Sequence, residues 1–121
     1  MRFAVNVEPV EQFNAWVAQQ KQPAQMPTAD LAKRGADEIA EGGCQGCHTI
    51  KGTKAQGKSG PDLTHLASRK MIGAGLLALS DENLHTWISD PPAAKPGTKM
   101  PKLGLTREQI DAISAYLLTL K

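Results

Sequence analysis

Aromatic residues, cysteines and long apolar runs are all scarce in this chain of 121 residues. Only two Phe, two Trp and one Tyr are present, so Leu, Ile, Val and Ala must fill most of the core unless a bound group adds bulk. The longest apolar run, counting glycine, extends from Met71 to Leu79 and is too short to cross a bilayer. The residues after Met1 do not form a secretion leader, so we expect a chain without one. This length predicts one domain of modest core, with room for an appendage.

Neither sign of charge dominates, since the formal net charge is +2. Residues 1–50 carry four basic and six acidic side chains, whereas residues 51–102 carry eight basic and four acidic ones. The basic side chains are scattered and have few aromatics between them, a pattern that disfavours nucleic-acid binding. A solvated loop surface is the preferred interpretation, and docking of an acidic partner protein stays open.

The N-terminal residues combine a strand pattern with a helix pattern. Alternation of apolar and polar residues over 3–7 predicts a strand with one apolar face. A lone strand cannot bury such a face without a sheet, which the pattern of the remaining chain does not offer. The following residues place Phe13, Trp16 and Val17 at helical spacing. Residues 1–21 are therefore expected not to fold as an independent unit.

A linker separates this piece from the remainder. Residues 22–28 hold two prolines and show no apolar periodicity. Thr28 is predicted to cap a helix over 29–41, and a further short helix is expected at 64–70. The face of the 29–41 helix that we expect to be buried consists of Leu31, Gly35 and Ile39.

Two later helices carry stronger start signals. Ser80 is predicted to cap a helix over 81–89 that ends at a pair of prolines. Residues 93–104 hold too many prolines and glycines for a helix or a central strand. Thr106 and Gln109 match a capping box before the last helix. The inward residues of these two helices are expected to be Leu84, Trp87, Ile88, Ile110, Ile113, Leu117 and Leu120. The fold class is predicted to be all-α.

Both cysteines lie in the segment CQGCH, where His48 follows Cys47 directly. A structural zinc site needs four ligands, and neither His65 nor His85 has a second histidine at the usual spacing. A thioredoxin-like redox pair belongs to a βαβ setting that the helical pattern does not provide. A disulfide between Cys44 and Cys47 closes too small a loop to stabilise much. Covalent haem attachment is the favoured chemistry, with zinc as the remaining alternative.

A haem held in this way needs a second axial ligand, for which four methionines compete. Met1 and Met26 precede the cysteine motif, and Met71 lies where a helix or its end is expected. Met100 lies in a rigid, proline-rich loop that can present its thioether at a fixed geometry. We therefore predict His48 and Met100 as the two iron ligands, although a methionine that merely packs the loop is the alternative interpretation.

The motifs "GCQGCHTIKGT", "GPDLTHL" and "GTKMP", followed by an amphipathic helix, resemble a class I cytochrome c domain over residues 28–121. The resemblance implies a small fold of helices around one covalently bound haem c. It also implies that the first and last helices cross where a glycine meets an aromatic residue. Gly35 and Tyr116 match these two positions.

The same resemblance suggests roles for three further residues. It implies that the carbonyl of Pro61 accepts a hydrogen bond from the axial His48, which sets the tautomer and basicity of the imidazole. Arg69 and Trp87 match positions that often contact the haem propionates in relatives. A core tryptophan and a solvated arginine are the alternative interpretations of these two residues.

The segment "MRFAVNVEPVEQFNAWVAQQ" resembles the last strand and exit helix of the copper-bearing domain in subunit II of haem–copper oxidases. Met1 stands where that family has the methionine of a copper-ligand motif, or is simply an initiator. The resemblance implies a remnant of the copper domain at 1–21, a linker at 22–28 and a cytochrome c domain at 29–121. It implies the C-terminal extension of a caa-type oxidase subunit, attached to a membrane only through an upstream part.

An iron with both axial positions filled is suited to outer-sphere electron transfer. The expected function is therefore one-electron transfer from a soluble cytochrome or other respiratory donor to the copper centre of the same subunit, with no catalysis by the isolated domain. The resemblance implies a periplasmic location, on the outer face of the bacterial membrane. A free soluble electron shuttle and a haem enzyme or gas sensor with a displaceable methionine stay open. The lysines expected to dock an acidic donor are Lys51, Lys54, Lys58, Lys99 and Lys102.

Overall fold

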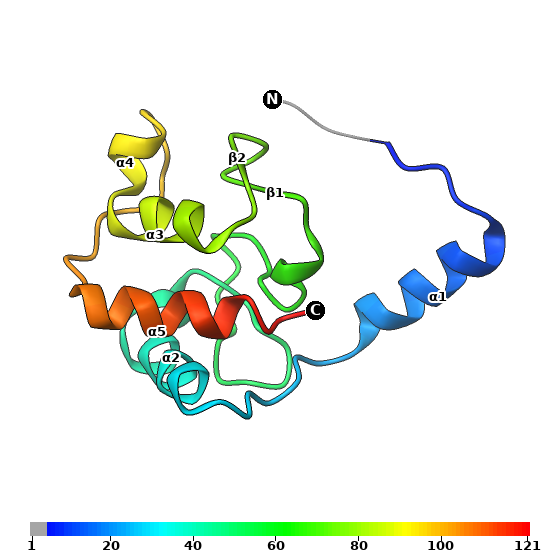
Figure 1. Cartoon of the computed structure of the whole chain (residues 1–121), viewed down its shortest axis with the longest axis horizontal. Coiled ribbons are helices and arrows are strands. Elements are labelled where there is room, and N and C mark those ends of the chain that lie inside the picture. The colour runs from blue at the N-terminus through cyan, green and yellow to red at the C-terminus, as the bar shows by residue number, and fades with distance from the viewer. Residues whose placement is uncertain (1–4) are drawn as a thin grey trace.

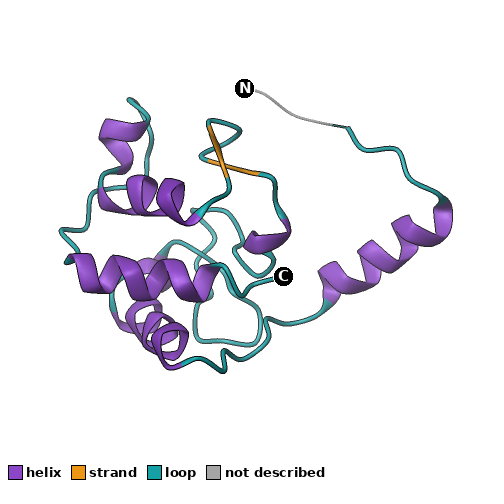
Figure 2. Ribbon diagram, viewed as in Figure 1, coloured by secondary structure: helices purple, strands orange, loops and turns teal. Residues whose placement is uncertain are grey.

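The computed structural model describes residues 5–121, and its regular elements are mostly helices (Figure 2). In chain order these are helix α1 (Val10–Lys21), helix α2 (Asp30–Glu41), the short helical turns η1 (Cys44–Gly46) and η2 (Leu66–Ser68), strands β1 (Met71–Ile72) and β2 (Leu77–Ala78), and helices α3 (Asp81–Ser89), α4 (Pro91–Ala94) and α5 (Arg107–Leu117). Helices α2 to α5 and their loops form one body, from which α1 extends away (Figure 1). The predicted helical class is confirmed. Among the described residues, no helix has the length and apolar character needed to cross a membrane.

Helices α2 and α5 cross at a glycine (Figure 1). A Cβ built on Gly35 would lie 2.8 Å from the Cβ of Tyr116 and would collide with the backbone carbonyl of Ala112. The two backbones therefore approach more closely than any side chain at position 35 allows. The predicted crossing of Gly35 with Tyr116 is confirmed, and it joins the first and last helices of the body.

The start of α2 differs from the prediction. The helix is capped by the extended residue Ala29, and no side chain accepts a hydrogen bond from its first turn. The expectation that Thr28 caps this helix is therefore wrong, because Thr28 lies one residue too early. Leu31 is also wrongly placed in the core, since 46% of its surface is exposed. The small Ala32 is part of the buried core in its place. The buried residues of α2 are Ala32, Gly35 and Ile39.

The predicted caps of α3 and α5 are confirmed. The hydroxyl of Ser80 accepts a hydrogen bond from the N–H of Asn83 at 3.2 Å. Thr106 and Gln109 form a reciprocal capping box, with bonds of 3.3 and 3.0 Å. Each cap satisfies amides that the helix cannot pair internally. Of the predicted inward residues, Trp87 is only half-buried, and the buried ones are Leu84, Ile88, Ile110, Ile113, Leu117 and Leu120.

Three local elements depart from the expectations. Met71, expected at a helix or its end, lies in β1, which pairs antiparallel with β2. The turn between these strands has positive φ at Gly73 and Ala74, so it is a tight reversal. The short helix expected at 64–70 is reduced to η2. Helix α4 extends into the segment predicted to be non-helical, because Asp90 caps it and prolines open its first turn.

The strand predicted over 3–7 is not formed in the part that the structure describes. Met1 and Phe3 lie outside the described residues, and Val5 to Val7 are irregular. No strand lies beside them within residues 5–121, so their backbone has no pairing partner. The helix predicted after them is confirmed as α1. None of its residues is buried, and Phe13 and Trp16 are about half exposed.

Candidate functional site

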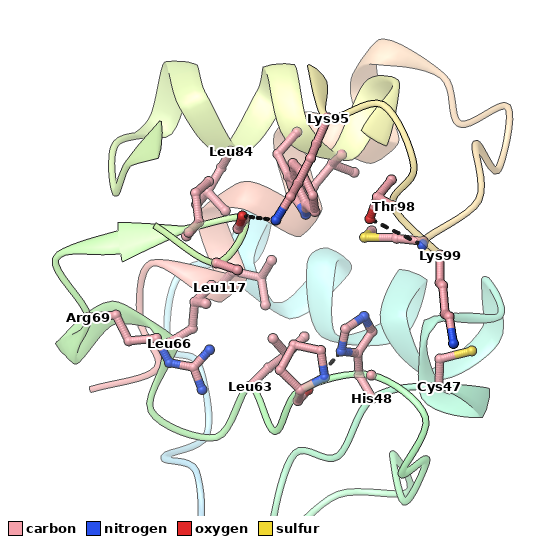
Figure 3. Close-up of a pocket in the computed structure, with 18 of the residues that line it drawn as sticks. Cys47, His48, Leu63, Leu66, Arg69, Leu84, Lys95, Thr98, Lys99 and Leu117 are labelled. Atoms are coloured by element: carbon pink, nitrogen blue, oxygen red, sulfur yellow. Dashed lines mark hydrogen bonds between the residues drawn. The ribbon is translucent and has the colours of Figure 1, made fainter. Parts of the chain in front are cut away.

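A cavity of about 630 Å³ lies between the turn after η1, the β1–β2 hairpin, α3 and the loop after α4. This volume falls within the range of cofactor sites in proteins. Figure 3 shows His48 and Leu63 on one side of the cavity, with Leu84, Lys95 and Thr98 on the opposite side. The apolar residues of the lining include Leu63, Leu66, Ile72, Leu84, Ile88 and Leu117. Of the predicted site residues, those that line the cavity are Cys47, His48, Pro61, Arg69, Trp87 and Met100.

The two thiols and the imidazole come from a single turn of chain. Helix α2 ends at Glu41. Gly43, with a φ of +87°, turns the chain, and η1 begins at Cys44. The carbonyl of Cys44 accepts hydrogen bonds from the N–H groups of Cys47 and His48, at 3.2 and 2.9 Å. Neither cysteine forms a disulfide. Cys44 is half-buried, and desolvation raises the pKa of its thiol, whereas Cys47 is exposed. The turn therefore offers two free thiols next to His48.

The ring of His48 is fixed by one hydrogen bond and one glycine. Its Nδ1 lies 2.8 Å from the carbonyl oxygen of Pro61. Because a carbonyl only accepts, the proton belongs on Nδ1 and the lone pair of Nε2 is left free to bind a metal. A Cβ on Gly60 would lie 2.6 Å from Cε1 of this ring, so only glycine leaves room for it. The Pro61 contact agrees with the resemblance.

Gly60 and Gly57 are functional positions that the sequence analysis missed. The N–H of Gly57 donates to the carbonyls of Gln45 and His48, at 3.0 and 3.1 Å, and a Cβ there would collide with the backbone of Cys47. Both glycines therefore allow the loop at residues 57–60 to pack closely against the cysteine motif. The glycine directly before Pro61 was a visible signal, but the site it serves lies twelve residues earlier in the chain.

Met100 reaches the cavity from the loop after α4. Its N–H points to the hydroxyl oxygen of Thr98, at 3.5 Å. The loop is tied on both sides of Met100, since Lys95 Nζ donates to the carbonyl of Gly73 and Lys102 Nζ pairs with a carboxylate oxygen of Asp90, each at 2.8 Å. These ties limit how far the loop can move from the hairpin and from α4.

The other methionines are placed differently. Met71 also lines the cavity, with 42% of its surface exposed. Met26 is exposed and is not part of the lining. Met1 lies outside the described residues. Two thioethers, those of Met71 and Met100, are therefore available to a group bound in the cavity.

Three cationic side chains stand at the margin of the cavity. The guanidinium of Arg69 donates to the backbone carbonyl of Asp62, and this contact holds it beside the lining (Figure 3). Lys95 and Lys99 also line the cavity; Lys99 was predicted only as a docking lysine, and Lys95 was not predicted in any role. Trp87 packs over the hairpin turn, where a Cβ on Gly73 would lie 3.2 Å from its ring. No periodicity in the sequence marks Lys95, because its position depends on the tertiary contact with Gly73.

These residues fit a covalently attached haem. The turn supplies two unpaired thiols for the vinyl groups and an imidazole with Nε2 free for iron. The apolar lining suits a porphyrin, and the cations at its margin suit carboxylate groups. Within residues 5–121, no three side chains of His, Cys, Asp or Glu gather into a set that could hold a metal ion by themselves.

Comparison with known proteins agrees with this fit. The family model for cytochrome c matches residues 32–121. The chain is 36% identical to cytochrome c oxidase subunit 2 of Bacillus sp. (strain PS3), over 100% of this chain and 35% of the relative. It is 38% identical to cytochrome c oxidase subunit 2 of Alkalihalophilus pseudofirmus, over 92% of this chain and 32% of the relative. Cytochrome c2 of Afifella marina is 34% identical over 63% of this chain and 73% of that protein.

The chain thus spans about a third of the length of the oxidase subunits that it matches. Their similarity extends over all or nearly all of its residues, including the part before the family match. The family match itself begins within α2, continues through α5 and includes every residue that lines the cavity. This chain therefore belongs to the cytochrome c family, and covalently bound haem c is its cofactor.

Proposed function

We propose that the chain transfers single electrons through a haem whose iron is held by His48 and Met100, and that it passes them to the copper centre of an oxidase subunit 2. The observation that carries this proposal is the delivery of two suitable ligands to one cavity. His48 has Nε2 free because Nδ1 is bound to Pro61, and Met100 comes from a loop tied at both ends.

The residues of this chain have separate tasks in such a transfer. Haem c, when bound, supplies an iron that changes by one electron. Cys44 and Cys47 hold the group from one turn of chain, so its position does not depend on packing alone. Pro61 keeps the proton of His48 away from the iron side. Met100 would hold the iron through a soft thioether, a donor that favours the reduced state, and would thereby keep a substrate from binding there.

Transfer to copper is supported by the oxidase relatives, which match this chain from end to end. On this proposal, residues 1–21 are the remnant of a copper domain, 22–28 the linker and 29–121 the cytochrome c domain. Its partners are then the copper domain of the same subunit and a soluble cytochrome or other respiratory donor. The complex faces the periplasm or the outer side of the bacterial membrane, attached through its upstream part.

A freely diffusing electron shuttle is the second candidate. Its support is the similarity to cytochrome c2, which covers 63% of this chain. The oxidase relatives extend that similarity to α1, which buries none of its own residues. A freely diffusing shuttle does not need a helix that packs against nothing in its own domain, so we favour the oxidase assignment.

Carbon monoxide tests the closed iron site. Adding it to the reduced, haem-loaded protein is expected to leave the optical spectrum unchanged, because both axial positions are filled by protein ligands. Fast, stoichiometric binding by the wild type would instead support a haem enzyme or gas sensor.

The copper step needs its own test in an oxidase subunit 2 that carries this domain. Rapid reduction of the haem should be followed by reoxidation at a rate independent of protein concentration, because both centres belong to one chain. Removing copper is the control and should abolish this phase. A rate that rises in proportion to concentration would favour the diffusing shuttle.

A further inference from the structure

Residues 20–24, which we call the strap, join the end of α1 to the body of the molecule. The sequence predicts part of this segment to be a linker, yet the structure shows it held at several points. The buried ring of His65, only 7% exposed, has Nε2 at 3.1 Å from the carbonyl oxygen of Gln22. Its Nδ1 lies 2.8 Å from the backbone oxygen of Lys121. His65 thus bridges the strap and the C-terminal residue, a role unrelated to the cavity.

Lys51 holds the strap on a second side. Its carbonyl accepts a hydrogen bond from the N–H of Ala24 at 2.9 Å, and its Nζ donates to the carbonyl of Gln20 at 3.3 Å. Ala24 also packs against the hydrophobic core. Because Lys51 is the third residue after His48, the strap is fastened to the segment that carries the proposed iron ligand.

The next residue shows how closely the strap is seated. Gly52 has a φ of +88°, which only glycine adopts readily. A Cβ at this position would lie 2.9 Å from the Cβ of Pro23. Pro23 therefore packs directly against the backbone at Gly52, where no side chain larger than that of glycine would fit.

The strap decides how α1 is held. The helix ends at Lys21, inside the strap, and none of its own residues is buried against the body. Figure 1 shows it extending away from α2 to α5, joined only at its C-terminal end. Within the described residues, the contacts of His65, Lys51 and Gly52 are therefore what fixes the direction of α1.

We propose that the strap locks α1 to the cytochrome c domain, with His65 as its principal positioning residue, so that the two move as one rigid body. This inference rests on the proposed function, in which α1 belongs to the remnant of the copper domain. A locked helix sets one orientation of the haem relative to that domain. A flexible linker instead lets the domain sample many orientations, of which few are productive.

Nitrogen-15 relaxation of the reduced, haem-loaded chain tests the lock, since ferrous iron with two axial protein ligands is diamagnetic. The backbone order parameters of α1 are expected to match those of α2 and α5, at about 0.85. In His65→Leu, which keeps the bulk of the side chain but removes both contacts, those of α1 should fall below about 0.6. Those of α2 and α5, and the haem spectrum, should stay unchanged.

Two further variants keep the test decisive. Ala24→Pro removes the N–H that donates to Lys51 without touching the buried histidine, so it replaces His65→Leu if that protein fails to fold. His85→Leu is the matched control, because His85 contacts Asp81 and Asp111 and not the strap. It should leave α1 as rigid as in the wild type.

Two outcomes would overturn the lock. One is a wild-type α1 that already moves independently of α2 and α5. The other is an α1 that stays rigid in the strap variants. Neither outcome concerns iron ligation, which carbon monoxide tests separately. A mobile α1 in a protein that does not bind carbon monoxide would reject only the proposal that the strap locks α1. A rigid α1 in a protein that binds carbon monoxide would reject only the proposed electron transfer.

Discussion

A series of hydrogen bonds connects the residues after Pro61 with the residues after His48. Next to Pro61, a carboxylate oxygen of Asp62 accepts from the N–H and the hydroxyl of Thr64, at 2.8 and 2.5 Å. The hydroxyl oxygen of Thr64 in turn accepts from the N–H of Lys51 at 2.9 Å. The turn that presents the Pro61 carbonyl is thus connected to the segment after His48. Asp62 helps to hold the acceptor that fixes the imidazole.

Asp62 gives a prediction for the pH dependence of stability. Desolvation tends to raise the pKa of this carboxyl, but the hydrogen bonds from Thr64 and the charges of Lys51 and Arg69 outweigh it and lower the pKa below the usual 3.8. Its contribution to stability is therefore complete above that value and is lost as the pH falls through the folded pKa. Asp62→Asn should show a shallower decline of the free energy of unfolding below about pH 4.

The measurement is denaturant unfolding of the haem-loaded chain at a series of pH values. Asp37→Asn, which changes an exposed carboxylate of α2, is the control and should follow the wild type. Parallel curves for Asp62→Asn and the wild type would contradict the role given to Asp62.

At the scale of elements, the sequence predicted the helix caps that depend only on residues close together in the chain. Ser80 and the Thr106–Gln109 box cap their helices through their own side chains, so their patterns were sufficient. The β1–β2 hairpin has only two residue pairs, and its turn places the non-glycine Ala74 at positive φ. No alternating pattern precedes such a short hairpin. Its turn is also held by a tertiary contact, the hydrogen bond from Lys95 to Gly73, which a sequence does not display.

The α2–α5 crossing predicts a large effect of a small substitution. Gly35→Ala should destabilise the protein by about 3 kcal/mol, because the added methyl group forces the helices apart. Thermal or denaturant unfolding of the haem-loaded protein measures this loss. Lys33→Ala, on the exposed side of the same helix, should change the free energy of unfolding by no more than about 0.5 kcal/mol. Equal stability of Gly35→Ala and the wild type would show that the helices are not in close contact.

The loop of Met100 predicts a kinetic effect. Lys95→Met removes the hydrogen bond to Gly73 that ties this loop to the hairpin. Imidazole added to the oxidised protein must displace Met100 to bind iron, so its binding should become roughly ten-fold faster. Lys54→Met removes the same charge from a distant loop and should leave the rate unchanged. A binding rate in Lys95→Met equal to that of the wild type would mean that this tie does not restrain the loop.

The site was only partly predictable for the same reason as the fold. Cys44, Cys47 and His48 are adjacent in sequence, so their spacing reveals them. The contact of Pro61 followed from the family resemblance. Gly60 and Lys95 act through residues far along the chain, on the ring of His48 and the carbonyl of Gly73. Such roles become visible only when the chain is folded.

At the scale of the whole molecule, some lysines of the basic middle segment are engaged in contacts within the chain. Lys51 Nζ is bound to the carbonyl of Gln20, and Lys102 Nζ pairs with Asp90. Lys99 lines the cavity and is exposed. On the proposed function, we expect charge near the haem edge to steer an encounter more than it holds a complex together.

This charge predicts a dependence on ionic strength. Oxidation of the reduced protein by an anionic reagent such as ferricyanide should slow as salt is added, because screening weakens the attraction. A cationic oxidant is the control and should show no such slowing. Lys99→Glu should slow the anionic reaction at low salt and flatten its salt dependence. A rate with ferricyanide that does not change with ionic strength would contradict charge steering.

The most direct test of the central claim, iron closed by His48 and Met100, is an optical and redox titration of Met100→Ala beside Met71→Ala. Both methionines line the cavity, so Met71→Ala controls for the loss of a thioether from the lining. Met100→Ala should lose the sulfur-to-iron charge-transfer band, lower the potential by on the order of 100 mV and bind carbon monoxide, whereas Met71→Ala should match the wild type. A Met100→Ala protein with the spectrum and potential of the wild type would contradict the account.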